Sequence, residues 1–157
     1  MYLANTTRPD IAFAVNLLAR YSFAPTRRHW NGIKHILRYL KGTTDMGLFY
    51  CVNYCPNLVG YADAGYLSDP HKAQSQTGYV FIYGGTAISW RSTKQSTVAT
   101  SSNHAIIIAI HEASRKMCVV KIRSSDNVAD LFTKSLPTAT FKKMVHKLVM
   151  QRFKSLD

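Results

Sequence analysis

The stretch that decides the fold reads Tyr61-Ala62-Asp63-Ala64, Thr77-Gly78-Tyr79-Val80-Phe81, Ala87-Ile88-Ser89-Trp90-Arg91-Ser92 and Ser101-Ser102-Asn103-His104-Ala105-Ile106. The first three runs carry the aromatic and β-branched residues that favour strands. Gly84-Gly85 separates the second run from the third and is a hairpin signal. Serines open the fourth run and are good N-caps, so a helix is expected from about Asn103 to Met117. A single acid, Asp63, therefore lies inside an apolar strand that two further strands and a capped helix follow.

Two helices are expected before this core. The first begins near Pro9 and Asp10, which suit a first helical turn, and closes at Arg20-Tyr21-Ser22. Thr26 is a good N-cap for the second helix, and Gly42 is its C-terminal stop. The second helix has an apolar stripe of Trp30, Ile33, Leu37 and Leu40 and an opposite face with Lys34, Arg38 and Lys41. Those cations could follow a phosphate backbone, but the pattern alone favours an ordinary solvated face.

The rest of the chain alternates short apolar runs with turn residues. Strands are expected at 46–50, 58–64, 78–83 and 87–92. In the core helix the apolar face is expected to hold Ile106, Ile110 and Ala113. Residues 119–122 could begin a further strand, a short helix is expected at 128–133, and a final basic helix runs from Thr138 past Leu148 to Met150 or Arg152. These elements divide the chain into 1–45, 46–134 and 135–157.

The charge balance is unusual for a chain of 157 residues. Twenty Lys and Arg face eight Asp and Glu, which gives a formal net charge of +12. Such a field attracts polyanions, of which nucleic acid is the commonest. The alternatives are a solvated basic surface or a fragment of a larger, balanced protein. The apolar fraction of 46% is ordinary, so a globular domain with its own core is expected.

Other features exclude several classes of protein. The three cysteines, Cys51, Cys55 and Cys118, form no Cys-x-x-Cys pair, which favours a reducing compartment and makes a zinc site improbable. No apolar run reaches the roughly 18 residues of a membrane span, and the N-terminus lacks a secretory signal. The chain is therefore expected in the cytoplasm or nucleus, not secreted and with no membrane partner.

Several motifs together resemble a known family. They are Tyr2-Leu3-Ala4-Asn5, Thr7-Arg8-Pro9-Asp10, His35-Ile36-Leu37-Arg38-Tyr39-Leu40-Lys41-Gly42, Tyr61-Ala62-Asp63-Ala64, Thr77-Gly78-Tyr79-Val80-Phe81, Ile88-Ser89-Trp90, Lys94-Gln95, Val98-Ala99 and Asn127-Val128-Ala129-Asp130-Leu131-Phe132-Thr133-Lys134. The chain resembles the C-terminal part of a copia-type retrotransposon Pol polyprotein. Residues 2–42 look like the end of the reverse transcriptase region, and residues 58–134 look like a ribonuclease H domain.

The resemblance implies an incomplete ribonuclease H-like fold, an α/β (α+β) fold with a mixed sheet, preceded by two helices. It also implies a parent enzyme that cuts RNA–DNA hybrids with two Mg²⁺ or Mn²⁺ ions held by four acids. Asp63 matches the first of these catalytic, metal-binding acids and Asp130 the last. Ile106 replaces the helix glutamate, and the fourth-strand acid falls in a deletion near 117–123. Glu112 lies about 9 Å further along the helix and cannot replace the lost acid.

Three functions remain open at this point. The first is a degenerate fragment without catalysis, which holds no tightly bound ion. The second is a nucleic-acid-binding module, and the third is residual metal-dependent cleavage with a ligand from Asp69 or Asp126. The expected partners are an RNA–DNA hybrid or another nucleic acid, with association with intact Pol products as a further possibility. The candidate nucleic-acid-binding residues are Lys34, Arg38, Lys41, Lys72, Arg91 and Lys94, with Lys142, Lys143 and Lys147 of the C-terminal helix.

The deletion also has a consequence for the sheet. The first strand of the family fold is an interior strand, so losing the fourth strand is expected to expose an edge beside Asp63. Residues 119–122 could cover that edge if they pair there.

Overall fold

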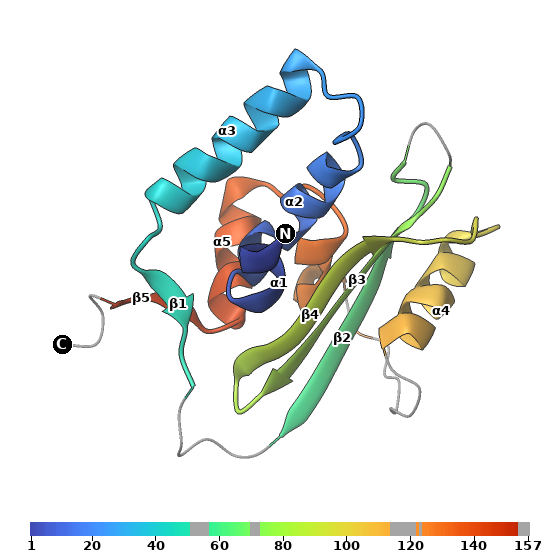
Figure 1. The fold of residues 1–157 in the computed structure, drawn as a ribbon. Helices are drawn as coiled ribbons and strands as arrows, with labels where there is room; N and C mark the ends of the chain where they lie inside the picture. Colours follow the sequence, from blue (N-terminus) through green and yellow to red (C-terminus); the bar gives the residue numbers. More distant parts are fainter. Residues whose placement is uncertain (51–56, 70–72, 114–121, 123, 154–157) are drawn as a thin grey trace.

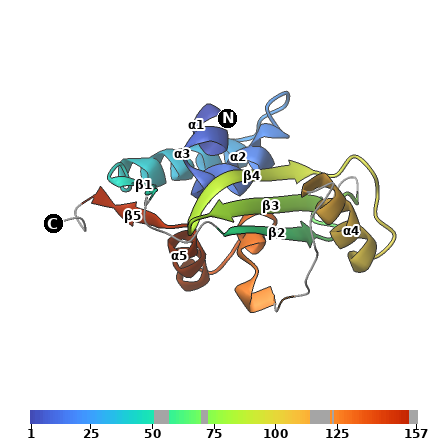
Figure 2. The same ribbon diagram turned by 90° about the horizontal axis from the view of Figure 1, so that it is seen from below.

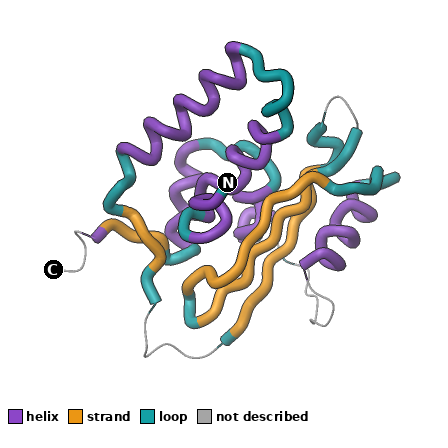
Figure 3. Tube along the Cα trace, viewed as in Figure 1, coloured by secondary structure: helices purple, strands orange, loops and turns teal. Residues whose placement is uncertain are grey.

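A computed structural model of the chain describes residues 1–50, 57–69, 73–113, 122 and 124–153. Figures 1 and 3 show how its helices and strands are arranged. In chain order the elements are α1 (Tyr2–Thr6), the 3₁₀ helix η1 (Pro9–Ile11), α2 (Ala12–Ala19), α3 (Arg27–Lys41), β1 (Met46–Leu48), β2 (Leu58–Gly65), β3 (Gln76–Tyr83), β4 (Thr86–Lys94), α4 (Ser102–Ala113), the 3₁₀ helices η2 (Ser124–Asp126) and η3 (Val128–Phe132), α5 (Thr138–Lys147) and β5 (Met150–Arg152).

The central sheet has the strand order β2-β3-β4, and both of its pairings are antiparallel (Figure 2). Gly84 and Gly85 have φ values of 55° and 83°, the left-handed conformation that a two-residue hairpin turn requires. The predicted hairpin is therefore confirmed. The second sheet, β1-β5, is also antiparallel, so the described strands do not form the mixed sheet that the resemblance implied.

Helices cover both faces of the central sheet. Side chains alternate along a strand, so Gly78, Val80 and Ile82 share one face. That face packs against η3 and carries the main core, which brings together Val80, Ile82, Trp90, Val128, Leu131, Phe132, Met144, Val145 and Leu148. Thr77 points to the opposite face, where Gln95 Nε2 donates hydrogen bonds to Thr77 Oγ1 (3.0 Å) and to Ala105 O (2.9 Å) of α4. Figure 1 shows α4 on the side of the sheet away from α2 and α5.

The face through which α4 packs differs from the prediction. Ala105 and Ala109 are fully buried, whereas Ile106 and Ile107 are 37% and 63% exposed. The two alanines are four residues apart and therefore lie on one helical face. Their small side chains allow the helix backbone to approach the sheet closely enough for the Gln95 contact, and this turns the isoleucines toward solvent.

The C-terminal helix ends earlier than predicted. Helix α5 stops at Lys147, and Val149 adopts a left-handed φ of 54°. Residues Met150–Arg152 then form β5, whose Met150 pairs with Leu48 of β1. The prediction of a helix through Met150 or Arg152 was wrong because this ladder, with an ion pair of 2.8 Å between Arg152 and Asp45, holds the segment extended.

The N-terminal segment forms α1 in addition to the two predicted helices. A buried ion pair stabilises this segment. In it, Arg8 Nε donates to Asp10 Oδ1 (3.0 Å) and Arg8 Nη2 donates to Asp10 Oδ2 (2.7 Å). Arg8 Nη1 also donates to Thr43 O (3.0 Å), and Tyr39 Oη donates to Asp10 Oδ2 (2.7 Å). Trp90 Nε1 donates to the Ala4 carbonyl (2.7 Å), so residues 1–45 are joined to the sheet.

Strand β2 lies at one edge of the described sheet, since its only partner there is β3. The exposed edge expected beside Asp63 stays a prediction, because residues 119–121, which could pair there, lie outside the described residues. Residues 119–121, the rest of the predicted core helix from 114 to 117, Lys72 and all three cysteines lie outside the described residues. Among the described helices, no segment has the length and apolar character needed to cross a membrane.

Candidate functional site

Asp63 and Asp130 come from distant parts of the sequence and meet on one face of the sheet. Asp63 lies on β2 opposite Gly78 of β3, and directly opposed residues of an antiparallel pair point to the same side. Thr133, at the end of η3, donates its hydroxyl hydrogen to Asp63 Oδ2 at 2.5 Å. The structure therefore brings the two predicted acids together through η3.

Two glycines allow η3 to lie this close to the strands. A Cβ atom at Gly78 would lie 2.6 Å from Thr133 Cγ2, 2.7 Å from Phe132 Cβ and 3.0 Å from Ala129 O. A Cβ atom at Gly65 would lie 2.7 Å from Thr133 O. Carbon atoms in contact normally stay about 3.5–4.0 Å apart. Glycine is thus required at both positions for the observed approach.

Asn127 fixes the start of η3 and also reaches the sheet edge. Its Oδ1 accepts a hydrogen bond from the Ala129 amide (3.1 Å), which caps the 3₁₀ helix. Its Nδ2 donates to the Ala62 carbonyl (3.0 Å), next to Asp63 on β2. One side chain therefore orients η3 and satisfies a backbone acceptor of the edge strand.

The environment of Asp130 combines burial with charges of both signs. Its side chain is 8% exposed, and Lys134 Nζ lies 2.8 Å from its Oδ2. Burial is the largest influence and raises the pKa of Asp130. Lys134 lowers this pKa, whereas the charge of Asp63 and a hydrogen bond with Asp63 raise it, and the net direction is upward.

These residues do not fit a pair of divalent cations. Two hard dications next to a phosphate need several oxygen ligands, and the described residues bring two carboxylates together here, one of them in contact with an ammonium group. Within the part of the chain that the structure describes, no three His, Cys, Asp or Glu side chains gather at a possible metal site. Ile106, which the resemblance placed at the position of the family's helix glutamate, is carried by α4 on the face of the sheet opposite η3.

Asp69 and Asp126, the two further acids considered as metal ligands, each contact a cation. Asp69 is 7% exposed and lies 3.1 Å from Lys94 Nζ and 3.9 Å from Arg20 Nη1. Asp126 lies 3.5 Å from Lys147 Nζ of α5. Each of these two carboxylates thus faces a cation.

The candidate nucleic-acid-binding residues fall on several elements. Lys34, Arg38 and Lys41 are exposed and lie along one side of α3. Arg91 is exposed on β4, whereas Lys94 at the end of β4 is half-buried against Asp69. On α5 the exposed cations are Lys142 and Lys143, and Lys147 pairs with Asp126. Among these cations, Lys34, Arg38 and Lys41 lie together on one side of a single helix, α3.

The apolar stripe of α3 is not its packing face. No residue of α3 is buried, and Trp30, Ile33 and Leu37 are 54%, 36% and 57% exposed. The helix packs through Gly32, where a Cβ atom would lie only 2.9 Å from Leu18 Cδ2 of α2. The basic side chains lie beside the stripe instead of opposite it, since Lys34 Nζ is 5.9 Å from the Trp30 ring centre.

Sequence reasoning missed the parts that Thr133 and Lys134 play. Both stood in the motif that ends with Lys134, but neither had been given a role. The signal was present, because Asp130 and Lys134 have the i, i+4 spacing of a helical ion pair and Thr133 follows Asp130 by three residues. What the spacing could not provide was the contact between Thr133 and a strand 70 residues away.

Comparisons with known proteins identify the family. No family model and no solved structure matches the chain. It is 40% identical over 124 residues to Secreted RxLR effector protein 161 of Plasmopara viticola, which covers 79% of this chain and 87% of that protein. It is 43% identical over 121 residues to the Retrovirus-related Pol polyprotein from transposon TNT 1-94 of Nicotiana tabacum, and 40% identical over 116 residues to that from transposon RE2 of Arabidopsis thaliana.

The Pol matches cover most of this chain and little of the relatives. They span 77% and 74% of the chain, but 9% and 8% of the two polyproteins. One relative is named as secreted, so the intracellular location expected from the sequence stays a prediction. The similarity nevertheless extends along about three quarters of the chain at a level that establishes common descent, and the chain is homologous to a part of copia-type retrotransposon Pol polyproteins.

Proposed function

We propose that the chain is a degenerate ribonuclease H-like module, which keeps two acids of a hybrid-cleaving ancestor and does not cleave nucleic acid. The observation that carries this proposal is the closed contact network around the two acids. Thr133 donates to Asp63, and Lys134 contacts Asp130 at 2.8 Å. Protein groups therefore take positions around both carboxylates that metal ions would otherwise use.

The donor set supports the same conclusion. Cleavage by two metal ions needs one ion to generate the attacking hydroxide and another to stabilise the leaving oxygen. Ile106 has no atom that can ligate a metal, and Asp69 and Asp126 lie against cations. Loss of groups that act as a unit commonly lowers a rate by orders of magnitude. A domain with only Asp63 and Asp130 is thus expected to lack measurable turnover.

A cleavage assay tests this proposal. A fluorescently labelled RNA–DNA hybrid is incubated with the purified chain and, separately, with Asp63→Asn, in Mg²⁺ and then in Mn²⁺. We expect both proteins to leave the RNA strand intact. Any cutting that persists in Asp63→Asn would be assigned to contaminating nuclease. Cutting by the unmodified chain that Asp63→Asn abolishes would overturn the proposal.

We infer nucleic-acid binding as a second candidate function, which is compatible with the first. Its support is the cationic side of α3, where Arg27, Lys34, Arg38 and Lys41 share a helix that contains no acidic residue. All four side chains are exposed, and none belongs to an ion pair among the described residues. Cations at helical spacing can neutralise successive phosphates and release their counterions.

Salt-dependent binding to labelled oligonucleotides tests this second function. Single-stranded RNA, duplex DNA and an RNA–DNA hybrid are titrated by fluorescence anisotropy between about 50 and 200 mM salt. Lys34→Ser with Arg38→Ser should weaken binding and lower the slope of log K against log salt by about two. Lys142→Ser with Lys143→Ser on α5 is the charge-matched control and should change both quantities less. Equal effects of the two pairs would show that net charge, not α3, governs binding.

A further inference from the structure

Helix α3 presents an unpartnered apolar strip to solvent. Trp30, Ile33 and Leu37 are spaced i, i+3, i+7, so they form one continuous row along the helix. Their exposed fractions are 54%, 36% and 57%, in a helix of 15 residues with no buried side chain. Single exposed apolar residues are common, but a contiguous row of large ones is typical of a binding surface.

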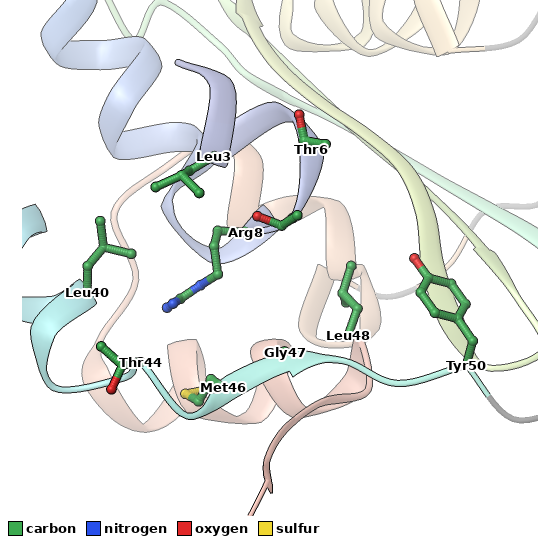
Figure 4. Close-up of a pocket in the computed structure, with 10 residues that line it drawn as sticks. Leu3, Thr6, Arg8, Leu40, Thr44, Met46, Gly47, Leu48 and Tyr50 are labelled. Carbon is green, nitrogen blue, oxygen red and sulfur yellow. The ribbon is translucent and has the colours of Figure 1, made fainter.

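The strip leads into a pocket at the C-terminal end of α3. Leu40 continues the row by three residues and lines a cavity of about 500 Å³ together with Leu3, Met46, Leu48 and Tyr50. Figure 4 shows that these side chains come from α1, from the end of α3 and from β1 with the residues after it. The exposed side of α3 is thus a row of apolar side chains that ends in a hollow.

The pocket is suited to an apolar side chain. Arg8 also lines it, but its guanidinium already donates to Asp10 and to the Thr43 carbonyl. It has little capacity left to recognise a polar small molecule. The volume exceeds that of a large aromatic side chain, and leucine and methionine form much of the wall. A bulky apolar anchor of a bound segment would therefore fill it well.

A row of cations borders the strip on its solvent side. At 3.6 residues per turn, Lys41, Lys34 and Arg38 lie within about 120° of the centre of the strip. Lys34 Nζ stands 5.9 Å from the centre of the Trp30 ring. Since α3 contains no acid, an occupant of the strip would meet only positive charge along this border. A second copy of a chain with a net charge of +12 is therefore a poor occupant.

We propose that the α3 strip and its pocket dock an acidic amphipathic helix of a partner protein. Such a helix would lay leucine-like anchors at i, i+3, i+4 and i+7 against Trp30, Ile33 and Leu37, and place its last anchor in the pocket. Its Glu and Asp side chains would face Lys34, Arg38 and Lys41. This inference goes beyond nucleic-acid binding, because it gives Ile33 and Leu37 a binding role. Contacts to phosphates would not involve these aliphatic side chains.

The observations favour a helix over the two other polyanionic surfaces. A flat lipid interface cannot enter the pocket, and basic residues border the strip on one side only, since the other side turns toward α2. A nucleic-acid backbone would match the cations but would leave Ile33 and Leu37 against charged and sugar groups. An acidic amphipathic helix can cover the strip, fill the pocket and face the bordering cations at the same time.

Anisotropy with a synthetic probe tests the proposal on the full chain. The probe is a fluorescein-labelled helical peptide of about 18 residues, with Leu anchors at the spacing above and Glu elsewhere. We expect saturable binding, and a version with Lys in place of Glu should bind at least about tenfold more weakly. Replacing the last Leu anchor of the peptide by Ala should weaken binding by several-fold. Equal binding of the Glu and Lys versions would overturn the proposal.

Two matched variants locate the binding surface. Leu37→Asp interrupts the strip, and His35→Asp makes a comparable charge change at an exposed position of the same helix that lies off the strip. Both side chains are exposed, so circular dichroism should show an intact fold. Leu37→Asp should weaken peptide binding about tenfold or more, and His35→Asp by a much smaller factor. Equal effects of the two variants would exclude the strip as the contact.

Two further ligands decide between classes of occupant. Vesicles with and without phosphatidylglycerol, and a single-stranded oligonucleotide, are titrated against the unmodified chain, Leu37→Asp and His35→Asp. Leu37→Asp and His35→Asp add the same charge to α3, so the proposal expects the two variants to weaken oligonucleotide binding equally, and it expects vesicles not to displace the peptide. Vesicle binding that depends on Leu37, or displacement of the peptide by vesicles, would instead assign the strip to a membrane surface and overturn the proposal.

Discussion

The close packing of η3 on the sheet can be tested by adding one methyl group at Gly78. In Gly78→Ala the new Cβ would lie 2.6 Å from Thr133 Cγ2 and 2.7 Å from Phe132 Cβ. Against a normal separation of about 3.5 Å, this is an overlap of roughly 0.8–0.9 Å with two carbon atoms. Phe132 is fully buried and its Cβ is fixed by the backbone, so rotation of a side chain cannot remove the clash.

The loss of stability in Gly78→Ala depends on which groups must move to remove the clash. The Ala129 carbonyl, 3.0 Å from the new Cβ, is a backbone group, so η3 as a whole has to shift away from β3. Overpacking of a well-packed core costs about 1–3 kcal/mol, and a clash with a rigid element belongs at the upper end. A loss of about 3 kcal/mol should lower the Tm of a chain of this size by roughly 6–12 °C.

Thermal and urea unfolding, followed by circular dichroism, measure the effect. Gly42→Ala is the matched control, because Gly42 has an ordinary φ of −82° and its Cβ would come no closer than 3.5 Å to another atom. That variant should keep or slightly raise the stability, by up to about 1 kcal/mol. If Gly78→Ala unfolded within about 2 °C of the control, η3 would not lie on the sheet as described, and the meeting of Asp63 with Asp130 would fall with it.

Three further variants test the buried polar contacts by urea unfolding. Asp10→Ala leaves the Arg8 guanidinium, 7% exposed, without its carboxylate and should cost about 3–5 kcal/mol, whereas adding Arg8→Met should recover much of this loss. Asp130→Asn should stabilise the protein by on the order of 1 kcal/mol at pH 7, because the raised pKa of Asp130 means that ionisation opposes folding as pH rises through it. The gain should shrink below about pH 4, where the carboxyl is protonated in both states, and a less stable variant at pH 7 would contradict the reasoning. Asn127→Ala removes the cap of η3 and the donor to β2 and should cost about 1–2 kcal/mol, with Asn127→Asp, which keeps only the cap, falling between.

The raised pKa of Asp130 reflects the cost of burying its charged carboxylate. A buried carboxylate beside another carboxylate is a cost to folding unless a ligand or a cation compensates it. In this chain Lys134 supplies part of that compensation, but its side chain is 46% exposed and the pair is partly screened by solvent. Under the proposed function, this arrangement is what remains after an ancestral acid cluster has lost members while the local backbone has stayed in place.

Local signals in the sequence predicted the hairpin, the short helix of η3 and the limits of α3. The Gly84-Gly85 turn needs left-handed backbone, which glycine adopts without a steric cost. Thr26 begins α3, and His29 Nδ1 accepts a hydrogen bond from its amide at 3.1 Å, a contact between residues three apart. Elements of this kind depend on neighbouring residues, so reading the chain in order is sufficient to find them.

The packing faces of the helices could not be read in the same way. The apolar stripes of α3 and α4 pointed to Trp30 and Ile106, yet the helices pack through Gly32 and through Ala105 and Ala109. Hydrophobicity alone favours the larger side chains. Close approach of two backbones favours the smaller ones, and the shape of the opposing surface decides between them.

The sequence by itself determined the family, the hairpin and the two acids Asp63 and Asp130, because motifs and turn residues act over short spans of chain. Only the tertiary structure decided that β5 pairs with β1, that Thr133 reaches Asp63, and that α3 exposes its apolar row. These contacts join residues up to 106 positions apart, as between Met46 and Arg152. Such contacts depend on the shapes and charges of surfaces that exist only after the chain has folded, and no local pattern encodes them.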